Sequence, residues 1–177
     1  MGLMTDVSCD IETTGTDPEH SAIIQIGAIK FNYDTGEVGE AFDRCLWMSP
    51  DRTWDEDTRE WWGKHPEVLT SIHARAEDPA IVLKDFIDWC GHGLRLWAKP
   101  TSFELPFLSS HFRQFSLPNP FHYRYARDLN SFLAALHGTA EHQWMKHVEF
   151  DGNPHDALDD ACFQLKVLLT AKEENAQ

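Results

Sequence analysis

The chain has 177 residues and a net charge of −14 at neutral pH, with 42% hydrophobic and 12% aromatic residues. These values fit one folded domain over residues 1–177 and exclude a disordered chain. No apolar run could cross a membrane and no signal-peptide pattern occurs, so we expect a cytoplasmic protein. The acidity argues against tight tracking along a duplex. It still permits an enzyme that grips one strand end through metal ions.

The hydrophobic pattern predicts three strands followed by alternating helices and short strands. We expect strands over 5–10, 22–31 and 38–47, in an antiparallel meander, and short strands over 94–98 and 123–126. Helices are predicted over 55–64, 67–73, 78–90, 102–115, 128–136 and 157–171, with a loop over 137–153 and a frayed tail over 172–177. This order predicts an α/β domain: a mixed sheet, meander plus parallel strands, with helices on both faces and the first strand central.

Two carboxylates stand at the end of the first predicted strand, in the run Cys9-Asp10-Ile11-Glu12-Thr13-Thr14-Gly15. Alternate side chains of a strand share a face, so Asp10 and Glu12 point to one side while Ile11 points into the core. Such neighbours raise each other's pKa unless a cation lies between them, and Mg²⁺ prefers oxygen ligands of this kind. A solvated acidic strand end has the same spacing, so both interpretations stay open for this motif alone.

A histidine and a carboxylate lie at the start of the last predicted helix. Pro154 keeps the residue before it out of helical conformation, so His155 lies at the helix entrance with Asp160 five residues later. Both can face one site only if His155 leans back over the helix, which suits a mobile general base beside a metal ligand. Alternatively, Asp156 and Asp159 only favour the helix dipole and Asp160 is exposed.

A third carboxylate, Glu104, lies in the first turn of the helix predicted after the short strand 94–98. It follows a polar loop, in the run Ser102-Phe103-Glu104-Leu105-Pro106. Considered alone, this glutamate fits an ordinary favourable interaction with the helix dipole equally well.

Taken together, D-I-E-T-T-G, S-F-E-L-P-F-L and H-D-A-L-D-D-A resemble the motifs of DnaQ-like 3′–5′ exonucleases of the DEDDh type, which have a ribonuclease-H-like fold. The resemblance extends from Asp10 to about Leu169. It is closest to the phage and mycobacterial exonuclease and exoribonuclease subgroup, which shares the Trp61-Trp62 pair and the H-D-A-L-x-D-A-x-x-Q-L helix that begins at His155.

The resemblance implies a two-metal site. Asp10, Glu12 and Asp160 resemble direct ligands of Mg²⁺ or Mn²⁺, with Asp10 also reaching a second ion. Glu104 takes the place of the family's second-motif Asp, and His155 resembles the base that deprotonates the attacking water. The substrate-binding candidates are Thr13, Gly15, Trp61, Trp62 and Phe103. The aromatic rings of Trp61, Trp62 and Phe103, and that of Trp97, could stack on terminal bases.

We therefore expect a metal-dependent 3′–5′ exonuclease that releases nucleoside 5′-monophosphates from the 3′ end of single-stranded or frayed nucleic acid. One alternative is a catalytically weakened DnaQ-like module that binds nucleic acid or protein, with Glu104 as the sign of decay. A ribonuclease-H-like endonuclease fits His155 and Asp160 less well. The sequence does not separate DNA from RNA, a homodimer stays open, and no membrane partner is expected.

Overall fold

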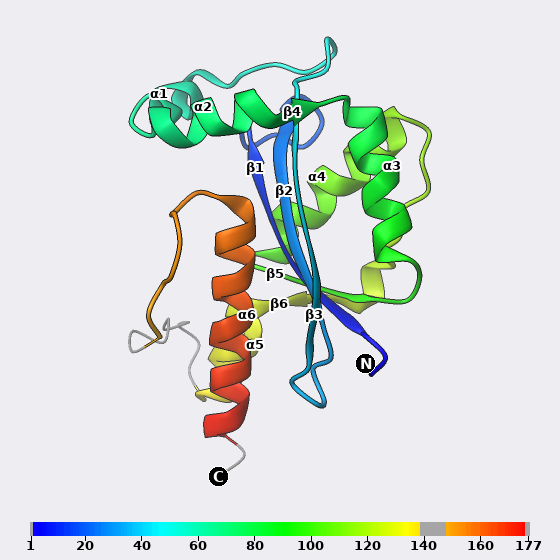
Figure 1. Cartoon of the computed structure of the whole chain (residues 1–177), viewed down its shortest axis with the longest axis vertical. Coiled ribbons are helices and arrows are strands. Elements are labelled where there is room, and N and C mark those ends of the chain that lie inside the picture. Colours follow the sequence, from blue (N-terminus) through cyan, green and yellow to red (C-terminus); the bar gives the residue numbers. More distant parts are fainter. Residues whose placement is uncertain (1, 139–147, 176–177) are drawn as a thin grey trace.

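A six-stranded mixed sheet runs through the computed structural model, which describes residues 2–138 and 148–175 (Figure 1). The strand order is β4-β3-β2-β1-β5-β6. The strands are β1 (Asp6–Thr13), β2 (Ile23–Phe31), β3 (Val38–Leu46), β4 (Ala76–Glu77), β5 (Arg95–Ala98) and β6 (Ala126–Asp128). Strands β1, β2 and β3 pair antiparallel, whereas β5 is parallel to β1 and β6 is parallel to β5. The predicted meander with β1 in a central position is confirmed.

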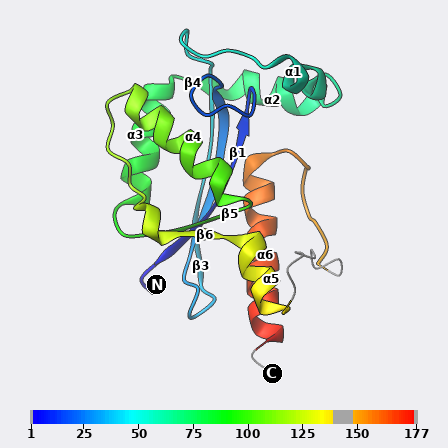
Figure 2. The same ribbon diagram turned by 180° about the vertical axis from the view of Figure 1, so that it is seen from behind.

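Helices cover both faces of the sheet, as predicted. They are α1 (Glu56–Trp62), α2 (Pro66–Arg75), α3 (Pro79–Cys90), α4 (Thr101–Gln114), α5 (Leu129–Leu136) and α6 (Ala157–Glu174). Helices α3 and α4 lie on one side of the sheet, and α5 and α6 on the other (Figures 1 and 2). Side chains of β1 alternate between them: Val7, Cys9 and Ile11 belong to the core under α3 and α4, and Ser8 contacts α6.

Two sequence predictions fail at the ends of elements. The strand predicted over 123–126 is instead a 3₁₀ turn, η1 (Tyr123–Tyr125). The His122 side chain caps this turn by accepting a hydrogen bond from the Arg124 N–H. The strand follows it, at β6. The tail predicted to fray from Lys172 remains helical to Glu174, since Lys172 donates from α6 to the Asp34 carbonyl at 2.8 Å. Residues 139–147 of the predicted loop lie outside the described residues.

The described helices include none with the length and apolar character needed to span a bilayer.

Helix α6 begins in direct contact with the sheet at Gly27, which pairs with Asp10 across β1 and β2. A Cβ at Gly27 would lie 2.1 Å from the Ala157 carbonyl carbon, so only glycine permits this approach. Polar contacts fix the same position: the Ser8 hydroxyl donates to the Ala161 carbonyl at 2.9 Å, and the Gln25 side chain accepts from the Ala157 N–H at 3.2 Å. The first turn of α6 is thereby held beside Asp10.

The opposite end of β1 is tied to β5 by a buried ion pair. Asp6 is fully buried and accepts hydrogen bonds from Arg95 at 2.6 Å and from the Trp97 indole at 2.8 Å. Burial by itself would raise the pKa of Asp6, but the hydrogen bonds from Arg95, Thr5 and Trp97 lower it below its ordinary value. The carboxylate is therefore ionised, and it fixes the parallel register of β1 and β5.

We predict that Gly27→Ala destabilises the fold by about 3 kcal/mol or more, because the added methyl group meets backbone atoms of α6 that cannot rotate away. Gly39→Ala is the matched control. Its Cβ would meet the flexible Met4 side chain at 3.0 Å, so its cost should be below about 1 kcal/mol. Urea unfolding of both variants measures the difference; equal losses would contradict the proposed contact.

Candidate active site

The two carboxylates of β1 point toward α6. Asp10 and Glu12 are both half-buried on this side, while Ile11 between them is 5% exposed in the opposite core, as predicted. Asp10 accepts a hydrogen bond of 2.7 Å from the Gln164 amide, which lies on α6. One oxygen of Asp10 is therefore held by the helix that carries Asp160.

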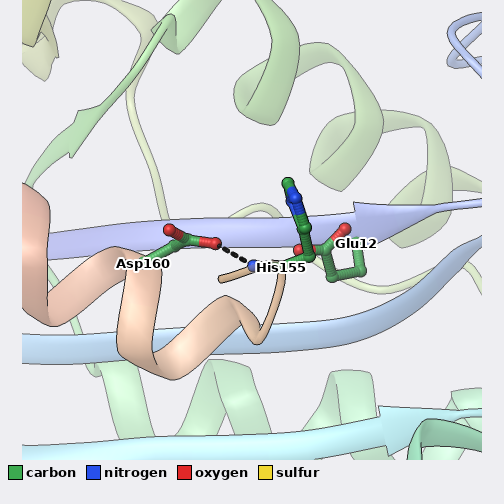
Figure 3. Close-up of side chains that lie close together, drawn as sticks. All are labelled: Glu12, His155 and Asp160. Atoms are coloured by element: carbon green, nitrogen blue, oxygen red, sulfur yellow. Dashed lines mark hydrogen bonds between the residues drawn. The ribbon is translucent and has the colours of Figure 1, made fainter. Parts of the chain in front are cut away.

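His155 lies just before α6, with its backbone N–H directed at the first turn of the helix. Its backbone has a φ of 68°, a left-handed conformation that is uncommon outside glycine. Its N–H donates to the Asp160 carboxylate at 2.9 Å, and Asp156 caps the helix through Leu158 and Asp159. One possible ligand atom from each of Glu12, His155 and Asp160 lies within 4.8 Å of the others (Figure 3). Residues from β1 and from 155–160 therefore converge on one point.

Glu104 approaches the same centre from the first turn of α4. The start of this helix is fixed to β6, because the Thr101 N–H donates to Asp128 at 3.1 Å and the Thr101 hydroxyl donates to the Arg127 carbonyl at 2.6 Å. Glu104 is 2% exposed, and its Oε2 has no hydrogen-bond partner among the described residues. A buried carboxylate oxygen without a partner is costly unless another group, such as a cation, satisfies it.

The electrostatics of the cluster indicate a cation site. Burial, followed by the nearby Asp160, raises the pKa of Asp10 to about 8. Burial and then Asp10 raise the pKa values of Glu12 and Glu104 well above their ordinary range, and burial raises that of Asp160. Four acidic groups that resist ionisation together provide the hard oxygen ligands that Mg²⁺ and Mn²⁺ prefer. The residues present therefore fit divalent cations.

The base candidate has the opposite shift. Burial, and then the neighbouring His65, lower the pKa of His155, with Asp160 acting against them. An imidazole of lowered pKa is neutral at pH 7 and can accept a proton.

Sequence reasoning gave no role to Gln164, and it considered Lys99 only as a contact to a phosphate or as a member of a salt bridge. Gln164 follows Asp160 by four residues, a spacing that places both on one face of α6 and could have revealed it. Burial lowers the pKa of Lys99, while Asp10 and Asp160 act in the opposite direction, so this ammonium group lies near the carboxylates. Only the pairing of β5 with β1 brings Lys99 to this place.

The substrate-binding candidates divide into two groups. Trp62 is 1% exposed and donates its indole N–H to the Thr13 carbonyl at 3.0 Å, so the prediction that its ring stacks on a base is corrected: the ring is part of the core. Thr13 and Gly15 are also buried, and the Thr13 hydroxyl donates to the Gly15 carbonyl at 2.7 Å. Trp61 and Phe103 are partly exposed and remain candidates.

Comparison with known proteins shows which family the chain belongs to. A model of the family described as "3′–5′ exoribonuclease Rv2179c-like domain" matches residues 5–171, and the chain belongs to this family. The chain also matches the PolC-type DNA polymerase III of Streptococcus thermophilus, with 30% identity over 115 residues. This match covers 64% of the chain and only 7% of the polymerase.

Solved structures have the same fold. A zinc-bound complex of E. coli exonuclease I with single-stranded DNA matches with a TM-score of 0.74 and 16% identity, over 99% of this chain and 42% of the other. The nuclease domain of 3′hExo, a DEDDh family member bound to rAMP, matches with a TM-score of 0.62 and 20% identity, over 96% and 93%. The expected ribonuclease-H-like fold is confirmed, and the matching family model describes the chain as a 3′–5′ exoribonuclease Rv2179c-like domain.

We predict that the metal-free protein loses stability as pH rises from about 4 to about 8. The folded state keeps the Asp10 proton to about pH 8, whereas the unfolded chain releases it near 3.8, so the unfolded state binds fewer protons within this window. Asp10→Asn removes the titrating group, and with it this pH-dependent contribution to stability, while its side-chain oxygen can still accept the Gln164 hydrogen bond. In EDTA, the variant should melt at a higher temperature than the wild type at pH 8, and this difference in melting temperature should be smaller at pH 4. An equal difference at both pH values would contradict the prediction.

Proposed function

We propose that the protein hydrolyses the terminal phosphodiester bond at the 3′ end of single-stranded or frayed nucleic acid and releases nucleoside 5′-monophosphates. The observation that carries the proposal is the cluster of Glu12, His155 and Asp160, whose possible ligand atoms lie within 4.8 Å of one another. Asp10 and Glu104 lie close enough to this cluster for Asp160 to raise the pKa of Asp10, and for Asp10 to raise that of Glu104. Membership in an exoribonuclease family supports the same reaction.

The carboxylates would hold two divalent cations, Mg²⁺ or Mn²⁺. Such ions, when bound, stabilise charge on the attacking and leaving oxygens of a phosphodiester. The Gln164 amide N–H donates to Oδ1 of Asp10 and holds that carboxylate in place. Glu104 would contribute its Oε2, which has no hydrogen-bond partner among the described residues.

His155 would take the proton from the attacking water. Its lowered pKa keeps the imidazole neutral at physiological pH, as a general base requires. The hydrogen bond from its N–H to Asp160 fixes the start of the side chain next to a proposed metal ligand. The proposed base and one of the proposed metal ligands therefore come from the same short segment, residues 155–160.

The proposed substrate is a single-strand end. One of the two solved structures described above is bound to single-stranded DNA and the other to rAMP. The comparison therefore supports a single-strand end as substrate, and both DNA and RNA strands need to be tested. Trp61 and Phe103 are the proposed contacts to terminal bases, because their rings are partly exposed. A homodimer and a cytoplasmic location stay predictions.

We predict that a 5′-labelled RNA or DNA strand gives a ladder of shortened products with Mg²⁺ or Mn²⁺, and remains intact in EDTA. His155→Ala should lower the rate about 10²- to 10⁴-fold, because the water loses its base. Electrophoresis of matched RNA and DNA strands measures both. A strand with a blocked 3′ end is the control and should be degraded slowly. Immediate release of the labelled 5′ nucleotide would contradict the assigned polarity.

Glu104 decides between an active enzyme and a weakened binding module. We predict that Glu104→Gln loses most activity, since it removes the charge and keeps the shape, and that Glu104→Asp is also impaired, because the shorter arm leaves a gap. Mn²⁺ should restore Glu104→Asp better than Mg²⁺, which demands stricter octahedral geometry. Rates at saturating metal measure this. An inert wild type and an active Glu104→Asp would favour the binding module instead.

A further inference from the structure

The His155 ring has no hydrogen bond that could orient it within the described part of the chain. Its backbone N–H is used by Asp160, and no bond from either ring nitrogen occurs there. A general base is normally oriented by a third group that bonds to it. Rotation of this ring would carry its nitrogen away from Glu12 and Asp160, whose possible ligand atoms lie within 4.8 Å of it. Among the described residues, the contacts that remain to hold the ring are those with neighbouring rings.

Two neighbouring rings provide that contact. The Trp61 ring meets His155 edge-on, with centroids 4.6 Å apart and planes at 84°. The His65 ring meets it at 4.6 Å and 62°, and lies 4.5 Å from Trp61. Ring pairs at these separations are favourable, and angled pairs are preferred over face-to-face ones. Two such contacts, from different sides, favour one orientation of the His155 ring.

His65 is a rigid support for such a contact. It lies at the N-cap of α2, where Ser, Thr, Asp or Asn would normally bond to the helix, yet its side chain makes no capping hydrogen bond. Its backbone is fixed on both sides, by the bond from its N–H to the Trp62 carbonyl at 2.9 Å and by the Leu69 N–H at 3.2 Å. Pro66 follows and restricts the chain further. The imidazole is directed at His155 from a backbone with little freedom.

We propose that His65 is a positioning residue: together with Trp61 it holds the His155 ring in the orientation from which it removes the proton of the attacking water. This inference rests on the proposed function and adds to it a residue that contacts neither substrate nor metal. The contribution of His65 is then orientation, so its loss lowers the rate of the chemical step and leaves substrate binding unchanged.

The test compares His65→Ala, His65→Phe and His73→Ala, each alone and combined with His155→Ala. His73 is an exposed histidine on the same helix and serves as the matched control. His65→Ala should lower kcat about 10- to 100-fold at unchanged KM. His65→Phe, which keeps a ring at this place, should recover most of the rate, and His73→Ala should match the wild type. In the His155→Ala background, His65→Ala should cause no further loss.

A second readout does not depend on activity. The NMR shifts of the His155 ring protons report the currents of the neighbouring rings, so His65→Ala should move them and His73→Ala should not. Unchanged shifts, an equal loss of kcat in both backgrounds, a change confined to KM, or an unaffected kcat in His65→Ala would each overturn the proposal. If the wild type hydrolyses no strand, the proposed function fails, while the ring shifts still show whether His65 packs against His155.

Discussion

The contact between the first turn of α6 and the sheet at Gly27 is the constraint on which the site depends. Without a side chain at Gly27, the backbone of Ala157 comes close enough for Gln164 to bond to Asp10. This contact brings together residues about 150 positions apart in the sequence. It also explains why His155 has an unusual backbone: the chain must turn sharply to enter a helix already pressed against β1 and β2.

The same contact makes an unfavourable electrostatic contribution to the stability of the fold, which other interactions must offset. Four carboxylates gather where burial already disfavours their charged forms, so the site is unfavourable to stability until a cation balances it. The large apolar cores on the two faces of the sheet offset that cost. At the other end of β1, the buried pair of Asp6 and Arg95 anchors the strand, so the repulsion at Asp10 does not displace it.

Much of the fold could be predicted from the sequence because its signals are local. Alternation in β1 placed Asp10 and Glu12 on one face and Ile11 on the other, and Pro154 placed His155 outside the helix. Predictions failed where a distant contact decides the local structure. The side chain of Lys172 reaches the β2–β3 turn and keeps the last turn of α6 intact, and Trp62 turns into the core to bond with Thr13.

The sequence by itself indicated the class of chemistry, because strand alternation places Asp10 and Glu12 on one face and the motifs around Asp10, Glu104 and His155 resemble those of a nuclease family. Only the tertiary structure decided the surroundings of these residues. The bond from Gln164 to Asp10, the partnerless oxygen of Glu104 and the rings of Trp61 and His65 against His155 depend on packing between elements distant in the chain. Periodicity encodes which way a side chain faces on its own element, and carries no information about what meets it there.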